Sequence, residues 1–448
     1  MVGPPSQPAK PPAGICMSDR PVRRLSPSSP PQSWQPLLRF ARRIGAPLRR
    51  ILQLESASGI LLLVSAALAL VWANSAWTAS YADLWHTRIG VHIGSFVLER
   101  SLEWWVNDGL MVIFFFSVGL EIRAELHHGA LSEWKRAALP AAAAAGGMCL
   151  PAALYLALAG TPPTRSGWGV PMATDIAFAL GILALLGKRV PAPLRILLLA
   201  LAVIDDVGAI IVIAIFYSSE VALSGLVVAA LAIGVVLGMQ RCGVRSKVAY
   251  ALPAVIAWAG VYRAGIHPTI AGVILGLITP VHERPEPLHR VDVTQREDRS
   301  PAESLIRTLR PWVAFVIMPI FALANAGVVI PRSSLDTASV RVVAAVSAGL
   351  VFGKPIGVLT ASWLVLRLRL GTLPPGVTFR HLVVLGVLAG VGFTMALFIA
   401  QLAFRDAQLL NAARIGVLAA SGAAAVLGLL MGRALLRAGP AIPPIESE

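Results

Sequence analysis

Two adjacent carboxylates stand in the middle of an apolar stretch of this sequence. Asp205 and Asp206 interrupt the run Leu194–Phe216, within the segment LAVIDDVGAI. A run of this length can cross a bilayer as a helix, since roughly 20 apolar residues span the hydrocarbon core. A carboxylate at that depth costs at least ~2.5 kcal/mol on insertion scales, so such acids are read as functional and as facing a cavity or a partner. Successive helix positions point about 100° apart, so the two acids should have different partners.

Two other apolar runs carry polar residues where the helix is interrupted. In PMATDIAFALG, Thr174 and Asp175 follow a proline, and in LAGVGFTMALF, Gly390 and Gly392 precede Thr394. These are the fourth and eleventh apolar runs along the chain. Short, Gly/Pro-interrupted spans in corresponding positions of two halves are typical of transporters built from inverted repeats, with the site where the broken helices cross.

The chemistry expected at such a crossing is that of ions. Facing helix N-termini concentrate partial positive charge and suit an acid such as Asp175, whereas facing C-termini suit a cation such as Lys354, which precedes Pro355 in GLVFGKPIG. Hard cations prefer several oxygen ligands, so Asp205 and Asp206 are candidate ligands of a transient Na⁺. Burial disfavours the charged form of an acid, so a proton and a cation can compete for one such site.

The composition sets the class of protein that must hold these residues. Of 448 residues 56% are hydrophobic and only 14% charged, and the mean hydropathy is +0.73. Soluble domains carry about 25% charged residues, and the apolar runs are continuous rather than alternating, so an all-α polytopic membrane protein is predicted. The formal charge of +15 lies largely near the N-terminus and in short loops, where it sets membrane orientation, so nucleic-acid binding is not expected.

The apolar runs predict about twelve transmembrane helices, several of them short. Lys and Arg recur in the loops after the even-numbered runs, which places both termini in the cytoplasm. The expected spans are 56–74, 105–120, 137–159, 169–186, 194–216, 222–239, 248–262, 266–279, 312–330, 342–366, 382–400 and 415–436.

The segments outside the spans complete the organisation. Residues 1–50 are rich in Pro, Ser and Arg and are expected to be a disordered cytoplasmic extension with a possible amphipathic surface segment, ahead of a transmembrane domain at 51–438 and a cytoplasmic tail at 439–448. The outer loop Thr87–Arg100 has β-branched residues broken by glycines and predicts a short hairpin. A lone hairpin is marginal in water, which favours a homodimer paired through it. The three cysteines show no bridge or metal spacing, and no cofactor is expected.

Seven motifs together resemble the NhaA sodium/proton antiporters, and the resemblance covers about Glu55 to Arg437. They are WVNDGLMVIFFFSVGLEI from Trp105, ATDIAFALG from Ala173, LAVIDDVGAI from Leu201, GIHPTIAGVILG from Gly265, PIFALANAG from Pro319, GKPIG from Gly353 and GVGFTMALF from Gly390. This family is itself a standard example of transporters built from inverted repeats.

The resemblance implies a role for each central residue. Asp206 would be the principal ligand of cation and proton, Asp205 would pair with Lys354, and Asp175 with Thr174 would lie at the helix crossing. It further implies electrogenic exchange of cytoplasmic Na⁺ or Li⁺ for external H⁺, two protons per sodium, across a bacterial inner membrane, in sodium and pH homeostasis. Either Lys354 or a second aspartate could carry the second proton.

Weaker candidates belong to the ion funnel or the pH response. They are Asp108 and Glu121 near span ends, His267 beside a proline, Asn325, and Glu283 in the long loop from His282 to Arg310. The chain departs from the family pattern after Glu121 and in SLIRTLRPW from Ser304, both in the funnel that tunes the pH response. The pH set point therefore does not follow from the resemblance.

Two other functions use comparable residues. A sodium-coupled solute symporter shares the broken-helix scaffold but needs a pocket for a larger solute. An intramembrane aspartyl protease needs two carboxylates that face each other and share a proton, normally one of them in a Gly-x-Gly-Asp turn, and this sequence has no such turn.

Overall fold

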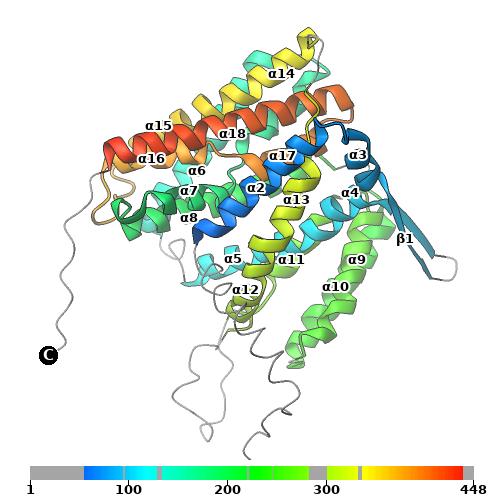
Figure 1. Ribbon diagram of the computed structural model, residues 1–448. Coiled ribbons are helices and arrows are strands. Elements are labelled where there is room, and N and C mark those ends of the chain that lie inside the picture. Colours follow the sequence, from blue (N-terminus) through cyan, green and yellow to red (C-terminus); the bar gives the residue numbers. More distant parts are fainter. Residues whose placement is uncertain are drawn as a thin grey trace, which may run out of the picture. The chain divides into compact units, whose positions relative to one another are not determined.

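The computed structural model (Figure 1) describes residues 55–93, 96–128, 134–218, 221–244, 246–281, 300–330 and 335–436. The contacts divide the chain into two units, Met1–Ile51 and Leu52–Glu448, and every described residue belongs to the second. The predicted extension at 1–50 and the tail at 439–448 lie outside the described residues.

The described part is a bundle of helices with one two-stranded sheet. Its first elements are α2 (Glu55–Ala73), α3 (Thr78–His86), β1 (Arg88–Ile93), β2 (Phe96–Ser101), α4 (Leu102–Trp104), the π-helix η2 (Trp105–Leu110), α5 (Met111–His128), α6 (Trp134–Ala159), the 3-10 helix η4 (Thr164–Met172), α7 (Ile176–Leu185), η5 (Gly187–Arg189) and α8 (Ala192–Phe216). The later elements are α9 (Leu223–Arg241), η6 (Val248–Tyr250), α10 (Ala251–Arg263), α11 (Thr269–Leu277), α12 (Pro301–Trp312), the π-helix η8 (Val313–Ile317), α13 (Met318–Asn325), α14 (Thr337–Ala348), the π-helix η9 (Gly349–Gly353), α15 (Lys354–Arg367), α16 (Phe379–Ala389), α17 (Phe393–Ala403) and α18 (Ala407–Leu435).

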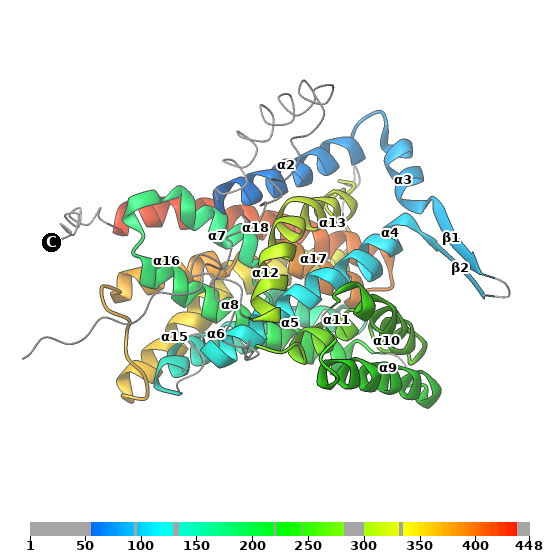
Figure 2. The same ribbon diagram turned by 90° about the horizontal axis from the view of Figure 1, so that it is seen from below.

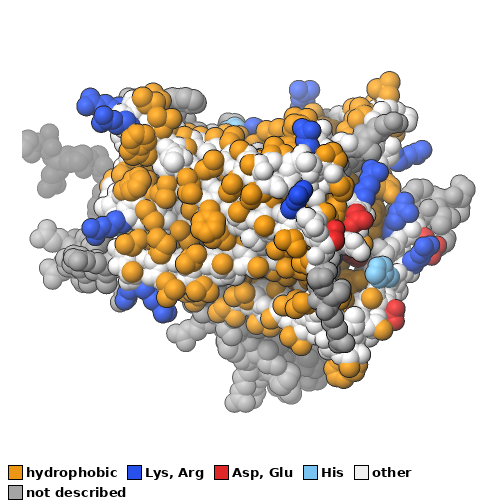
Figure 3. Space-filling model, turned by 90° about the horizontal axis from the view of Figure 1, so that it is seen from above, with side chains coloured by type: hydrophobic (Ala, Val, Ile, Leu, Met, Phe, Trp, Pro, Cys, Tyr) orange, Lys and Arg blue, Asp and Glu red, His pale blue; other side chains and the backbone are white. Residues whose placement is uncertain are grey.

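Several helices are long and apolar enough to cross a membrane. Within the described ranges there are 6 such helices, or up to 9 if each sharply bent pair counts as one span. Large apolar side chains on them point outward, among them Leu231 and Leu430, as expected for surfaces that face lipid. Figure 3 shows one face of the molecule, where apolar side chains cover a broad central area and most charged ones lie toward its edges. The chain is therefore a multi-pass membrane protein.

Two of the bent pairs meet inside the bundle. η4 and α7 form an angle of 46°, and α16 and α17 form an angle of 43°. The first pair joins a 3-10 helix to an α-helix, whereas a broken α-helix was expected. The third bent pair, α2 with α3 at 114°, was not predicted.

Small residues bring the helices of the site close together. A Cβ atom added to Gly357 of α15 would lie 2.1 Å from the carbonyl oxygen of Gly146 in α6. Only glycine permits this approach, which is the usual way in which membrane helices pack without a hydrophobic driving force between them. The contact holds α15, and hence Lys354 at its start, against α6.

Two helices begin earlier than the apolar runs indicated. α12 starts at Pro301, inside the expected loop from His282 to Arg310, where Ser300 caps it by accepting from the Glu303 N–H at 3.5 Å. α18 starts at Ala407, eight residues before the predicted span, because Asp406 caps its first turn. Polar first turns continue these helices beyond the apolar core, so hydropathy alone misplaced both starts.

The predicted hairpin is confirmed. β1 and β2 pair antiparallel with Arg88 opposite Ser101 and Ile93 opposite Phe96. In Figures 1 and 2 the two strands project away from the helices, beside α3 and α4. Arg100 at its base donates to the Tyr262 hydroxyl at 2.7 Å, which ties the hairpin to α10. We call this side of the bundle the hairpin end.

Candidate functional site

The two adjacent carboxylates lie near the middle of α8 and are both buried, with exposed fractions of 0% for Asp205 and 1% for Asp206. Oδ2 of Asp205 lies 2.6 Å from Nζ of Lys354 and 2.6 Å from the Thr174 hydroxyl. Among the described residues, no protein group hydrogen bonds to either carboxylate oxygen of Asp206. The two acids therefore differ in environment, since Asp205 has protein partners and Asp206 has no hydrogen-bond partner among the described residues.

Lys354 reaches the site from the start of α15 and is fully buried. Besides Asp205, its Nζ donates to the carbonyl oxygen of Met172, the last residue of η4. Pro355 has no N–H to donate, and the turn before it is the π-helix η9. The ammonium thus lies between a carboxylate and the negative end of a short helix, as its predicted placement required.

Asp175 lies between the N-termini of two helices. Oδ1 accepts from the Phe178 N–H of α7 at 3.0 Å, and Oδ2 accepts from the Thr394 N–H of α17 at 3.1 Å. The Thr394 hydroxyl also donates to Oδ2. The carboxylate is 1% exposed. Facing helix N-termini favour a negative charge, which is the environment predicted for this acid.

The two breaks also touch through their backbones. The Asp175 N–H donates to the carbonyl of Val391 at 2.7 Å, and the Thr174 hydroxyl lies 3.0 Å from the carbonyl of Ala389. That hydroxyl also contacts Asp205, and with one proton it can donate to only one of these acceptors at a time. Thr174 therefore joins both breaks to the acid on α8.

The glycines at the second break act through their lack of a side chain rather than through unusual dihedral angles. Gly390 and Gly392 have φ values of −67° and −90°, which any residue can adopt. A Cβ on Gly390 would lie 2.5 Å from the carbonyl oxygen of Leu350, and one on Gly392 would lie 3.0 Å from that of Ala173. The glycines allow three chain segments to meet at the break.

The electrostatics single out Asp206. Asp205 is ion-paired, and Asp175 accepts from two helix N-termini, whereas Asp206 has no hydrogen-bond donor among the described residues. Its charged neighbours are the acids Asp205, Glu121 and Asp175 and the ammonium of Lys354. A buried carboxylate without a partner is costly when charged, so a proton or a cation must accompany it.

The carboxylate oxygens of Asp205 and Asp206 are of the type that hard cations bind. Nowhere in the described ranges do three or more His, Cys, Asp or Glu side chains form a metal-binding group. Oδ1 of Asp205 also lacks a hydrogen-bond partner there. A hard cation takes several oxygen ligands, so carboxylate oxygens together with water suit an ion that is bound and released.

Comparison with known proteins decides the family. The sequence model of the family described as "Na+/H+ antiporter 1" matches residues 49–431. The chain belongs to this family. A protein of Myxococcus xanthus named Na(+)/H(+) antiporter NhaA 2 is 64% identical over 437 residues, which cover 91% of this chain and 93% of that protein.

Two other antiporter relatives also match over most of both chains. A Na(+)/H(+) antiporter NhaA 2 of Sorangium cellulosum is 51% identical, with 92% of this chain and 94% of that protein covered. A Na(+)/H(+) antiporter NhaA of Bordetella petrii is 48% identical, with 88% of this chain and 91% of that protein covered. The family resemblance inferred from the motifs is confirmed, and members of this antiporter family are transporters rather than enzymes.

The weaker candidate residues do not gather at one place: Asp108 lies near His267, Asn325 contacts Asn107, and Glu121 has Arg310 among its charged neighbours. Asp108 lies in η2 with its Oδ1 3.6 Å from Nε2 of His267. Glu121 lies in α5, with Arg310 of α12 among its charged neighbours. Asn325, at the end of α13, exchanges hydrogen bonds with Asn107. Glu283 lies outside the described residues.

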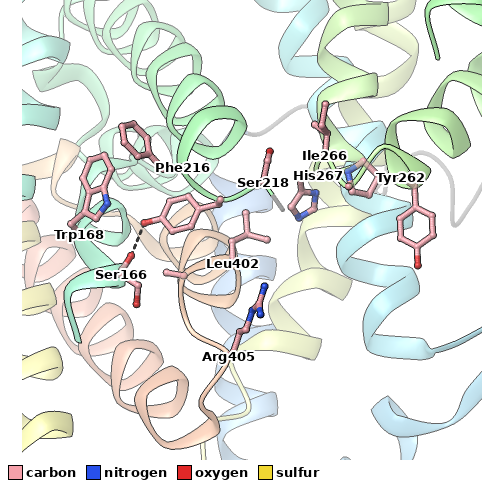
Figure 4. A pocket seen from close by; sticks show the side chains of 13 residues that line it. Ser166, Trp168, Phe216, Ser218, Tyr262, Ile266, His267, Leu402 and Arg405 are labelled. Atoms are coloured by element: carbon pink, nitrogen blue, oxygen red, sulfur yellow. Dashed lines mark hydrogen bonds between the residues drawn. The ribbon is translucent and has the colours of Figure 1, made fainter. Parts of the chain in front are cut away.

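A pocket of about 500 Å³ opens beside His267 (Figure 4), lined also by Trp168, Tyr217 and Arg405. The Tyr217 hydroxyl donates to the Ser166 carbonyl at 2.8 Å, a contact between two residues that line the pocket. None of the three buried aspartates lines this pocket, nor does Lys354. The ion site and the pocket are therefore separate features.

Two charged residues that the sequence did not single out also lie in the bundle. Arg414 in α18 and Glu103 in α4 form an ion pair with an N–O distance of 3.2 Å. The last span was expected to start at Ile415, which placed Arg414 just outside it. The rule that charges within a span are functional would have selected Arg414 had the Asp406 cap been recognised.

Proposed function

We propose that this chain is an electrogenic antiporter that exports cytoplasmic Na⁺ in exchange for external H⁺, driven by the proton gradient, and that Asp206 binds the two ions in turn. The observation that carries the proposal is the buried carboxylate of Asp206, which has no hydrogen-bond partner among the described residues and lies next to the neutralised Asp205–Lys354 pair. The family and the names of the relatives support the same ions.

Competition for one carboxylate explains obligatory exchange. A proton on Asp206 removes the negative charge that holds a cation, and a cation displaces the proton. Only one of the two ions can therefore satisfy the buried acid at a time. Asp175 supports this arrangement because it fixes the two short helices that approach the site.

The proposed scaffold has about twelve spans. The continuous helical stretch α4–η2–α5, together with α10 and α11, would supply spans beyond those counted above. The η4/α7 and α16/α17 pairs would be the broken, crossing fourth and eleventh spans of an inverted repeat. Contacts between Asp175 and Val391 and between Thr174 and Ala389 support the crossing.

The second proton of each cycle has two candidate carriers. Lys354 could release its proton when a cation weakens its pairing with Asp205, and a second aspartate, Asp205 or Asp175, could bind one. We favour Lys354, because a buried lysine loses its proton readily.

Localisation and partners follow from the pattern of charges. The recurrence of Lys and Arg in alternate loops supports a bacterial inner-membrane protein with both termini in the cytoplasm. The projecting strands β1 and β2 have edges that are not paired with a further strand, and a second copy of the chain can cover them. The protein would then form a homodimer through the hairpin of residues 87–100. Li⁺, a hard monovalent cation like Na⁺, would be a second substrate, and the apolar outer surface contacts lipid.

The two rival functions receive less support. A solute symporter needs a larger pocket at the acids, and the pocket beside His267 is not lined by them. An aspartyl protease needs two acids that share a proton, whereas Asp205 is paired with Lys354.

The test is a transport assay in inverted membrane vesicles that hold a proton gradient, to which Na⁺, Li⁺ or K⁺ is added without organic solute. Na⁺ and Li⁺ are expected to dissipate the gradient, and K⁺ is not. No response to Na⁺ in vesicles that contain folded protein would refute the proposal, and a response only in the presence of an organic solute would favour the symporter.

A further inference from the structure

Five polar side chains form a cluster at the hairpin end, away from the buried aspartates. Nη2 of Arg414 lies 3.2 Å from Oε1 of Glu103 and 3.2 Å from Oδ1 of Asn325. Nε2 of Gln401 lies 3.4 Å from the same Glu103 oxygen, and Asn325 donates to Asn107 at 2.8 Å. We call this cluster the Glu103 clasp.

The clasp joins five elements from three distant parts of the sequence. Glu103 belongs to α4, Asn107 to η2, Asn325 to α13, Gln401 to α17 and Arg414 to α18. Figure 2 shows α4, α13 and α17 together near the base of the hairpin. Asn325 and Asn107 are buried, with exposed fractions of 0% and 4%, so the geometry of this polar network is fixed by its surroundings.

Two of these helices, α17 and α18, are also joined by a hydrogen bond near the ion site. The Phe393 N–H of α17 donates to the Ser421 hydroxyl of α18 at 3.0 Å, next to the Thr394 N–H that binds Asp175. Gln401 follows Thr394 by seven residues, and Ser421 follows Arg414 by seven. Seven residues are about two helical turns. On each helix the residue in the clasp and the residue near Asp175 therefore lie on the same face.

We propose that Glu103 and Arg414 are positioning residues, which hold α17 and α18 so that the N-terminus of α17 stays on Asp175. The inference rests on the proposed function, since it assigns the clasp a part in cation binding. α17 is a short, rigid helix with one end in the clasp and the other at the ion site. Loss of the clasp frees the distant end, and the N-terminal end then shifts relative to the carboxylate.

The expected effect is on cation affinity rather than on the maximal rate. The variants Glu103→Gln and Arg414→Gln should each raise the apparent KM for Na⁺ about fivefold, within the range of coupled neighbours. The maximal rate should change by less than about twofold, because the ligands of the ion are untouched. A general folding defect would instead lower the amount of active protein and leave KM unchanged.

The experiment compares these two variants, the double variant E103Q/R414Q and two controls in vesicles at several Na⁺ concentrations. Asp83→Asn and Arg405→Gln remove exposed charges near the same end and should keep the wild-type KM. Thermal unfolding of the same proteins in detergent gives a readout without transport. There the double variant should lose less stability than the sum of the single losses, because each single variant leaves one partly buried charge unpaired.

The two readouts separate failure of this inference from failure of the proposed function. If the wild-type protein does not exchange Na⁺ for H⁺, both the proposed antiport function and the proposed role of the clasp in cation binding are overturned, whatever the unfolding data show. Active wild-type protein with unchanged KM in both single variants would overturn the positioning role alone. Additive losses of stability would also overturn it, because they would mean that Glu103 and Arg414 do not interact.

Discussion

The backbone N–H of Thr394 donates a hydrogen bond of 3.1 Å to Oδ2 of Asp175, an acid 219 positions earlier in the chain. The other oxygen of the same carboxylate caps α7. One side chain therefore fixes the first turns of two short helices at their point of contact. The carboxylate is thus a structural link between the two breaks and also an electrostatic neighbour of Asp206.

Thr394 offers a test of this link. Thr394→Val removes the hydroxyl that donates to Asp175 and is expected to destabilise the protein by about 1–3 kcal/mol, because a buried acceptor loses a donor. Thr394→Ser keeps the hydroxyl and is the matched control. The measurement is thermal unfolding in detergent, and equal stability of the two variants would show that the hydroxyl contributes little.

Asp206→Asn is expected to abolish exchange and to leave a folded protein, because the amide keeps the shape of the side chain but cannot titrate. Exchange is measured in inverted vesicles, and folding by gel filtration of the detergent extract. Asp83→Asn changes an exposed aspartate of α3 and serves as control. Full exchange by Asp206→Asn would remove Asp206 from the central role.

The Asp205–Lys354 pair should show strong coupling. Asp205→Asn or Lys354→Gln alone leaves one buried charge unpaired, which costs on the order of 3–5 kcal/mol. The double variant should be more stable than either single one, since no unpaired charge remains at this position. A complete double-mutant cycle by thermal unfolding gives the coupling, and simple additivity would argue against the pair.

Lys354 also governs the expected response to voltage. Two protons exchanged for one monovalent cation move net charge, which makes about 2.3 kcal/mol per 100 mV available to export. Sodium transport by wild-type proteoliposomes should therefore follow a potential set with valinomycin and K⁺. Lys354→Gln should become insensitive to this potential if Lys354 carries the second proton.

The voltage experiment also tests the alternative carrier. If the Lys354→Gln protein is active and its voltage dependence is unchanged, the second proton is carried by Asp205 or Asp175 instead. Its activity at zero potential is the control, because it separates loss of coupling from loss of transport.

Asp336 makes one pH dependence predictable outside the spans. It caps α14, and hydrogen bonding to Ser339 lowers the pKa of Asp336 below its usual value of 3.8. A lowered pKa in the folded state means that the carboxylate stabilises the protein above the unfolded pKa, and that this is lost as pH falls through the folded pKa.

Wild-type protein should therefore have a higher Tm than Asp336→Asn at neutral pH, and the difference should shrink as pH falls below about 4. Asparagine keeps the capping geometry, so the comparison isolates the charge. Unfolding scans across this range measure the difference, and a constant difference would contradict the assigned shift.

Local features of the sequence were enough for much of the architecture. Continuous apolar runs require helices in a membrane. The mid-span acids Asp205 and Asp206 indicated an ion site, because a charged side chain in the hydrocarbon core is energetically costly and is usually retained for function. The glycine-broken segment Thr87–Arg100 indicated the hairpin for an equally local reason. Motifs shared with a known family then indicated the exchanged ions.

Other features depended on contacts between distant segments. From the residues alone, either acid of α8 could have faced Lys354, and only the family resemblance favoured Asp205. Glu103 and Arg414 are 311 positions apart, and no local pattern predicts that they meet. The starts of α12 and α18 were misplaced because polar capping turns carry no hydropathy signal.

Composition and neighbours in the chain were sufficient to predict the class of protein, the candidate acids and the two helix breaks that meet inside the bundle, although not the bend between α2 and α3. Contacts in the folded protein establish which carboxylate is ion-paired, which one holds two helix N-termini and which one lacks a hydrogen-bond partner among the described residues. A charge in the interior is stabilised by atoms that packing brings to it, and packing joins residues without regard to their separation along the chain.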